Sequence, residues 1–288
     1  MSLSNWLTLG AVLAGSAAAA SPVTIEGFAT PESVALTDTA AYVSNIGAQL
    51  DPFSHDGDGF ISKLGLDGTV TKLHAIDGLD SPKGLTVLNG TLYVADIDRI
   101  LGFDLTTMAQ VFNAQVPGDA PMLLNAIEPM GDTLLVSDTL RSTLYSLAPD
   151  TGTYTELATG IDGANGITWN AEQNAATIAG VGADFGGSTM YRWSPTEGLS
   201  QIPDAPFGFL DGIVTLDDQT VLVSDWHQFD PVPGDIYAVN TANGDTKQLD
   251  LGTTVRAPAD FAYDAANGKI WVPQMHDGRV SIIDLPTE

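Results

Sequence analysis

The chain has 288 residues, no cysteine, 10 basic and 36 acidic side chains, and a formal net charge of −26. The lack of cysteine excludes disulfides, thiolate nucleophiles and sulfur-ligated metal centres, so any bound metal must use oxygen or imidazole ligands. The acidity excludes nucleic acids and anionic membranes as partners, because such a surface repels phosphate groups. We therefore expect neither as a partner.

The first twenty residues have the composition of a secretory signal peptide. An apolar run from Trp6 to Gly15 is too short to span a bilayer, and small residues follow it up to Ala18 and Ala20. The segment before this run has no Lys or Arg, which leaves a buried N-terminal segment as the alternative. We predict a signal peptide over 1–20, one domain over 21–288, and a secreted or periplasmic location.

One unit repeats six times along the rest of the chain, with start-to-start distances from 40 (124 to 164) to 51 residues (31 to 82). Each unit opens on a short apolar alternation and continues, after a turn, into a β-rich run that usually ends in Asp or Asn. The units begin at Pro31, Pro82, Leu124, Ala164, Leu210 and Pro258. Their second strands are expected at 41–45, 92–96, 134–138, 176–179, 221–225 and 270–273.

Further short strands with turn signals lie between these runs, for example 59–66 before Asp67-Gly68. Each unit thus holds about four strands, and no segment keeps the apolar spacing of an amphipathic helix. This pattern predicts an all-β fold, a six-bladed β-propeller. Two stacked β-sandwiches are the alternative, but they would not produce a phase-locked sixfold repeat.

The last unit has room for only three strands, near 261–264, 269–273 and 279–284. The segment 23–28 precedes the first unit, has strand composition and finds no partner there. We predict that it becomes the outer strand of the last blade. The ring is then closed and no strand edge is exposed.

The second residue of each start is predicted to face the central channel, because all inner strands of a propeller begin at the same face. This position holds Glu32, Lys83, Asn125, Asn165, Asp211 and Ala259, with Asp260 one residue further on. In the first five units a small residue follows: Ser33, Gly84, Ala126, Gly166 and Gly212. We interpret the pattern as a polar ring above crowded backbones.

Two carboxylates and two amides of this ring form an oxygen-rich site of the kind that Ca²⁺ accepts. The predicted metal ligands are Glu32, Asn125, Asn165 and Asp211. The alternative is that the pairs Asn165-Gly166 and Asp211-Gly212 only begin turns and bind no metal. The side chain of Lys83 is expected to point away from the metal position and toward a carboxylate.

The repeats and the ring resemble the gluconolactonase or senescence-marker-protein family, which is related to diisopropyl fluorophosphatase and paraoxonase. The resemblance covers essentially all of the chain after residue 20. In that family a Glu of the first blade, Asn of the third and fourth, and Asp of the fifth hold a metal, so the resemblance implies a divalent ion, Ca²⁺, at the same four residues. It also implies a monomer.

One difference from that family concerns the substrate. Sugar-lactone members have Arg two residues before the first metal-binding Asn, where this chain has Leu123. An apolar lactone or ester is therefore favoured over a sugar lactone. Met122, Leu123, Phe207 and Phe209 precede ring residues and are expected to line its pocket or to serve as ordinary core.

The predicted function is a metal-dependent hydrolase that acts on a lactone or ester, with Asp211 as the catalytic base. The alternative is a non-catalytic secreted propeller that binds a small ligand or a protein, with a structural calcium ion. His227 is a further acid–base candidate, although an exposed loop histidine explains it equally well. No Gly-x-Ser-x-Gly motif provides a serine nucleophile.

Overall fold

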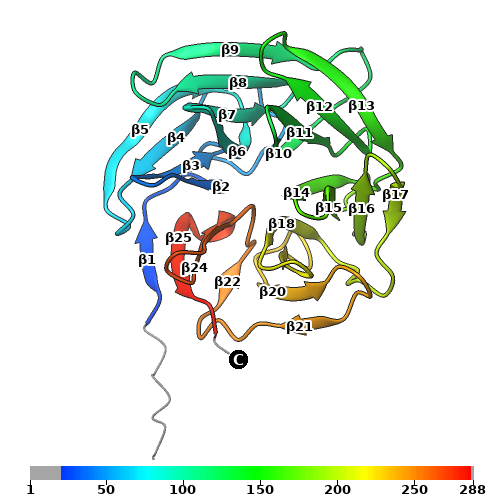
Figure 1. Cartoon of the computed structure of the whole chain (residues 1–288). Helices are drawn as coiled ribbons and strands as arrows, with labels where there is room; N and C mark the ends of the chain where they lie inside the picture. Colours follow the sequence, from blue (N-terminus) through cyan, green and yellow to red (C-terminus); the bar gives the residue numbers. More distant parts are fainter. Residues whose placement is uncertain (1–20, 287–288) are drawn as a thin grey trace, which may run out of the picture.

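The computed structural model describes residues 21–286, which form six antiparallel sheets arranged around a common axis (Figure 1). The predicted six-bladed β-propeller is confirmed. The expected signal peptide, 1–20, lies outside the described residues. Within the described range the helical element is a short 3₁₀ turn, Met275–Asp277, and no helix is long and apolar enough to cross a membrane.

The strands of each blade follow one another from the axis outward. Blades one to three consist of β2 (Pro31–Leu36), β3 (Ala41–Asn45), β4 (Gly59–Leu64) and β5 (Val70–Leu79); β6 (Pro82–Leu88), β7 (Thr91–Asp96), β8 (Arg99–Asp104) and β9 (Gln110–Gln115); and β10 (Leu124–Met130), β11 (Thr133–Asp138), β12 (Thr143–Ala148) and β13 (Thr153–Thr159). Blades four and five consist of β14 (Ala164–Asn170), β15 (Ala175–Gly180), β16 (Met190–Ser194) and β17 (Gly198–Gln201); and β18 (Leu210–Thr215), β19 (Thr220–Asp225), β20 (Pro233–Asn240) and β21 (Thr246–Gln248), with β22 (Val255–Arg256) also paired to β20.

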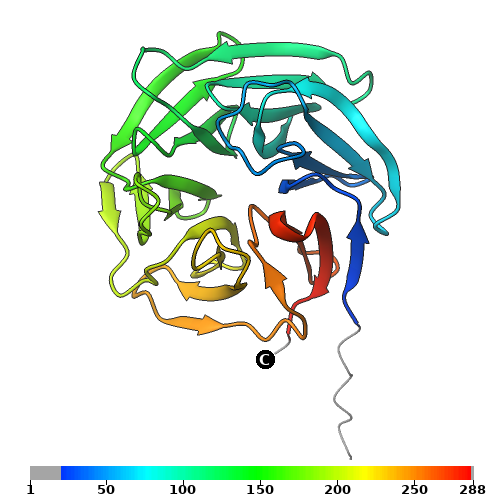
Figure 2. The ribbon, with the colours of Figure 1, turned by 180° about the vertical axis from the view of Figure 1, so that it is seen from behind.

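The sixth blade combines the two ends of the described chain, as predicted. It contains β23 (Ala262–Asp264), β24 (Lys269–Gln274), β25 (Arg279–Asp284) and, outermost, β1 (Val23–Glu26). β1 pairs antiparallel with β25, and the register runs from Val23 opposite Ile282 to Glu26 opposite Arg279. Both ribbon views show β1 beside β25, so the ring is closed by hydrogen bonds between strands (Figure 2).

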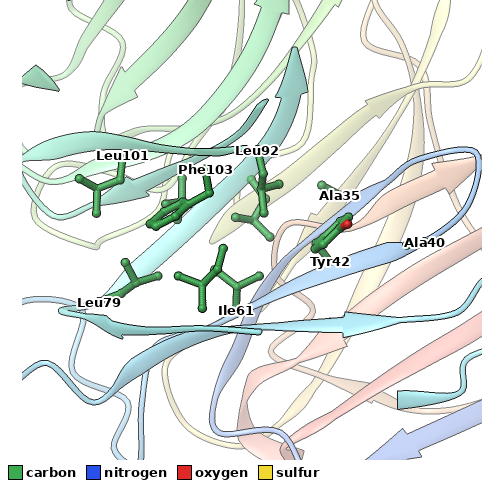
Figure 3. Packing of buried hydrophobic residues seen from close by; sticks show 11 residues of the cluster. Ala35, Ala40, Tyr42, Ile61, Leu79, Leu92, Leu101 and Phe103 are labelled. Carbon is green, nitrogen blue, oxygen red and sulfur yellow. The ribbon is translucent and has the colours of Figure 1, made fainter. Parts of the chain in front are cut away.

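The hydrophobic core lies mainly between neighbouring blades. Between the first two blades, Tyr42 and Ile61 pack with Leu92, Leu101 and Phe103 (Figure 3). The middle strands are buried on both faces, which explains their continuous apolar runs, while outer strands such as β13 are mostly exposed. Each blade therefore buries its faces only when its neighbours are present.

The polar residue at the end of most second strands has a structural function. Its side chain accepts a hydrogen bond from the backbone N–H just before the inner strand of the same blade. The pairs are Ala29 N to Asn45 Oδ1 (3.0 Å), Ser81 N to Asp96 Oδ1 (2.8 Å), Leu123 N to Asp138 Oδ1 (3.0 Å) and Phe209 N to Asp225 Oδ1 (3.0 Å). In the sixth blade Gln274 Oε1 accepts from the N–H of Arg256 in β22, further ahead of the inner strand (3.3 Å). These bonds help to fix where the inner strands of blades one, two, three and five begin, and so they help to position the ring residues Glu32, Lys83, Asn125 and Asp211.

Candidate functional site

The predicted ring residues lie together at one mouth of the propeller. Glu32, Lys83, Asn125, Asn165 and Asp211 are buried and line one small pocket of about 60 Å³. Each is the second residue of its inner strand, and in all five blades the pairing register shifts at this point. A β-bulge redirects a side chain, so the repeated irregularity explains why these polar residues face the axis rather than the blade core. At the sixth position, Ala259 is buried and contributes no polar group.

Three oxygen atoms of this pocket are buried without a hydrogen-bond partner: Glu32 Oε2, Asn165 Oδ1 and Asp211 Oδ1. The amide nitrogen of Asn165 donates to the carbonyl oxygen of Leu210 at 3.2 Å, which leaves its Oδ1 as the free acceptor. Native proteins rarely leave buried acceptors unpaired, because each unpaired group lowers the stability of the folded state. A cation would satisfy all three oxygens, so the residues present fit a metal ion.

The negative charges of the carboxylates at this mouth destabilise the protein when no cation is bound. Burial raises the pKa of Glu32 well above its ordinary value; the charges of Asp211 and Asp260 raise it further and Lys83 opposes them. Burial and the charge of Asp260 likewise raise the pKa of Asp211, while the side-chain N–H groups of Trp226 and Asn165, which lie near this carboxyl group but outside hydrogen-bonding geometry, oppose the rise. Two carboxyl groups that resist ionisation would ionise readily beside a divalent cation.

The composition of the ring restricts the kind of metal centre. Among residues 21–286 no group of three or more His, Cys, Asp or Glu side chains is arranged to hold a metal ion. The candidate centre therefore consists of two carboxylates and two amides. A donor set of oxygens alone suits a hard cation such as Ca²⁺ and does not suit zinc or copper.

Lys83 is held by neutral acceptors, so the expectation that it leans toward a carboxylate was wrong. Its ammonium group donates to the carbonyl oxygens of Pro52 (3.0 Å) and Ser81 (2.9 Å) and to Ser81 Oγ (3.2 Å). Burial lowers the pKa of Lys83 to about 8, although the nearby charge of Glu32 opposes this shift. All three N–H groups have partners, and the bond to Pro52 fixes the 46–58 connection over the mouth.

We expect Lys83→Met to release this connection, because methionine keeps the apolar stem but cannot donate to Pro52 or Ser81. The unpaired acceptors should lower the free energy of unfolding by about 1 to 3 kcal/mol. Amide hydrogen exchange in residues 46–58 should become faster, as mass spectrometry would show. Lys72→Met, on an exposed outer strand, is the matched control and should change neither quantity. Unchanged exchange in Lys83→Met would contradict the assigned role.

The walls above the polar residues are apolar, and the sequence predicted only part of them. Leu123 and Phe209 line the pocket as expected. Met122 does not line it and packs against the core between the second and third blades. Phe207 is 73 % exposed and also lies outside the lining.

Most wall residues lie in the connections that follow second strands, outside the repeated pattern of the sequence. Ile46, Leu50 and Pro52 follow the second strand of blade one. The corresponding connections of blades four, five and six add Val181, Phe185, Trp226, Phe229 and Met275. A signal for them exists in the sequence, because these apolar residues closely follow second strands, whose ends all lie at this mouth.

His227 does not line the pocket. Its Nε2 lies 2.8 Å from Asp235 Oδ2, and its Nδ1 lies 3.2 Å from Asp225 Oδ2. The ring is half-exposed and held between two carboxylates. This position favours the interpretation as a surface histidine over a role in acid–base chemistry at the mouth.

A second pocket, of about 260 Å³, is lined by residues further along the inner strands and therefore lies toward the other end of the axis. It contains two carboxyl groups, Glu128 and Asp260. Burial raises the pKa of Glu128 to about 8, the backbone N–H of Trp169 opposes this shift and the charge of Asp260 adds to it. Burial raises the pKa of Asp260 to about 6, against a hydrogen bond from Ser33. This pocket is separate from the metal-site candidate.

The pKa of Glu128 predicts how stability depends on pH. A carboxyl group whose pKa is raised on folding stabilises the protein fully below its ordinary pKa of 4.5, and this contribution is lost as the pH rises through about 8. We expect Glu128→Gln to reduce the loss of stability between pH 5 and 9 in urea unfolding with chelator present. Glu32 and Asp211 are present in both proteins, so their effect cancels in the comparison, whereas the repulsion between Glu128 and Asp260 is lost in the variant and adds to the expected difference. Identical pH profiles would refute the assignment.

Comparison with known proteins supports the fold. No protein-family model and no curated protein matches the chain. Similar solved structures include an inactive variant of virginiamycin B lyase from Staphylococcus aureus with quinupristin (15 % identity, 92 % of this chain and 100 % of that chain, TM-score 0.59) and a streptogramin B lyase (14 %, 92 % and 98 %, TM-score 0.62). Hydrazine synthase of Kuenenia stuttgartiensis is similar as well (15 %, 91 % and 78 %, TM-score 0.61). At these identities the likeness concerns the fold, which is that of a β-propeller.

Proposed function

We propose that this propeller is a metal-dependent hydrolase of a lactone or ester, with Ca²⁺ held at the mouth by Glu32, Asn125, Asn165 and Asp211. The observation that supports it most directly is the set of three unpartnered buried oxygens in one pocket. The gluconolactonase family, which this chain resembles, has its metal ligands in the same blades and in the same order. The resemblance therefore supports these four residues as the ligands.

When bound, a divalent ion polarises a carbonyl group and stabilises the negative charge that develops on its oxygen. The protein supplies the rest of the chemistry. Asp211 accepts a proton from a water molecule as the water oxygen bonds to the carbonyl carbon. The bond from that carbon to the alcohol oxygen then breaks, and the proton passes to this oxygen, which leaves a carboxylic acid and an alcohol. The apolar walls limit the entry of further water.

A non-catalytic binding propeller is the second candidate, and Lys83 is the observation that favours it. A buried ammonium group in the ring adds positive charge beside the proposed cation position. In a binding protein the ion would only stabilise the ring, and the same pocket would hold a ligand unchanged.

A panel of lactones and aryl esters distinguishes the two functions. The protein purified without residues 1–20 is assayed as isolated, after chelation, and after addition of Ca²⁺, with calcium binding measured by calorimetry. We expect turnover that disappears with chelator and returns with Ca²⁺. Calcium binding without turnover of any substrate would favour the binding propeller.

A further inference from the structure

We infer that the ligand of this mouth has a single polar end and an apolar body, as in a lactone or ester with a long hydrocarbon chain. The reaction at its carbonyl group rests on the proposed function, whereas binding of the apolar body does not. The inference comes from the distribution of polar groups and aromatic rings in the pocket.

The polar side chains of the pocket are confined to the ring residues. All three of their hydrogen-bond donor groups already have partners. The Lys83 ammonium donates to Pro52 and Ser81, and the amides of Asn165 and Asn125 donate to Leu210 and Thr139. Every other lining residue is apolar apart from the indole of Trp226. Each hydroxyl group of a sugar lactone placed against these walls would lose its water without gaining a partner, which weakens binding. The pocket therefore disfavours polyhydroxylated ligands.

Four aromatic side chains form one continuous wall, here called the aromatic wall: Phe185, Phe209, Trp226 and Phe229. Phe229 is at its centre, with its ring centroid 4.8 Å from that of Phe209, 5.5 Å from Phe185 and 6.1 Å from Trp226. Phe53, from the connection that Lys83 holds, contacts Phe185 edge-on at 6.4 Å. The wall thus extends from blades four and five across to blade one.

Part of this wall is open to solvent in the free protein. Phe229 is 46 % exposed and Phe53 is 44 % exposed, while Phe209 and Trp226 are buried behind them. Phe53 and Phe229 both contact Phe185, and exposed rings connected in this way beside a pocket are typical of a binding surface for an apolar ligand. Covering them would release water, and each further methylene group of the ligand buried against them would strengthen binding.

Binding is tested first with a neutral apolar dye, N-phenyl-1-naphthylamine, whose fluorescence rises in apolar surroundings. We expect one dye molecule to bind per chain and γ-undecanolactone to displace it. Glucono-δ-lactone at the same concentrations should not displace it. Displacement by the sugar lactone with the same potency as the alkyl lactone would overturn the inference.

Two phenylalanine variants locate the binding site. Phe229→Ala removes the central ring, and because this ring is half-exposed the protein should keep its fold. Its dissociation constant for the dye should increase at least about tenfold, the effect of losing two methylene-sized contacts. Phe207→Ala removes a more exposed phenylalanine outside the pocket and should leave dye binding unchanged. Equal effects of the two changes would show that the dye binds elsewhere.

The same reagents separate failure of this inference from failure of the proposed function. If the alkyl lactone binds with the expected dependence on Phe229 and is not hydrolysed, the hydrolase proposal fails and the apolar ligand class stands. If sugar lactones are hydrolysed and alkyl lactones are neither bound nor hydrolysed, the hydrolase proposal stands and the ligand class is wrong. If both kinds are hydrolysed, kcat/KM is compared across alkyl lactones of increasing chain length, each relative to the sugar lactone. This ratio must rise with chain length, and a ratio that does not change overturns the inference.

Discussion

Asp211→Asn should abolish turnover of the lactone or ester that the wild-type protein hydrolyses best. The amide cannot accept the proton of the attacking water, and loss of a general base lowers rates by about 100-fold to 10,000-fold. It also removes one of the two carboxylates that would bind the cation, so calcium affinity measured by calorimetry should fall. Steady-state kinetics with saturating Ca²⁺ separates the two effects, because weaker binding alone is restored by excess ion and loss of the base is not.

The stability of the same variant gives an independent result. Burial raises the pKa of Asp211, which means that its ionised form destabilises the metal-free protein at neutral pH. In chelator at pH 7, Asp211→Asn should therefore be at least as stable as the wild type toward urea. Asp184→Asn makes the same charge change in an exposed connection beside the pocket and should leave both rate and stability unchanged. Hydrolysis that survives in Asp211→Asn would remove this residue from the catalytic role.

Gly84→Ala should strongly destabilise the fold, since the inner strands approach one another too closely for a side chain at this position. A methyl group there would lie 2.5 Å from the carbonyl oxygen of Asn125 and 2.8 Å from the Cα of Ala126, which are backbone atoms of the next blade. Overpacking of this kind costs about 1 to 3 kcal/mol, and more where backbone must move. Urea unfolding would measure it, and because Asn125 is itself displaced, calcium binding should weaken as well.

The third blade provides the matched control for this change. Ala126 occupies the position equivalent to Gly84, and Ala126→Gly creates no clash. It should lower stability only by the roughly 0.5 to 1 kcal/mol expected for glycine in a strand interior. Similar losses in the two variants would show that backbone crowding is not the reason for the small residues of the ring.

The repeating features of this protein could be predicted from sequence because the same physical requirement recurs in every blade. The second strands are buried on both faces, and in four of the six blades the final Asp or Asn accepts a backbone hydrogen bond, so both features appear at a regular period. The position of the ring residues followed from the same alignment. The closure by β1 followed from a last unit that lacked one strand.

Features outside the repeat could not be predicted in this way. The partners of Lys83 lie in a connection that occurs once, and nothing in its spacing shows that Pro52 folds back over the mouth. The aromatic wall likewise combines Phe185 with Trp226 and Phe229 from two different connections. Phe207 was misplaced because proximity to Asp211 in the sequence does not determine which way a loop side chain turns. Such contacts depend on tertiary structure rather than on local pattern.

The pairing of β1 with β25 sets a limit on when the molecule can fold during its synthesis. Val23 and Ile282 are partners, so the sixth blade is incomplete until β25 has left the ribosome. Before that moment the first and fifth blades each lack the neighbour that covers one face, and contacts of such large sequence separation form slowly. Closure of the ring is therefore a late step. A nascent chain stalled before β25 should remain open to protease, whereas the released protein should resist it.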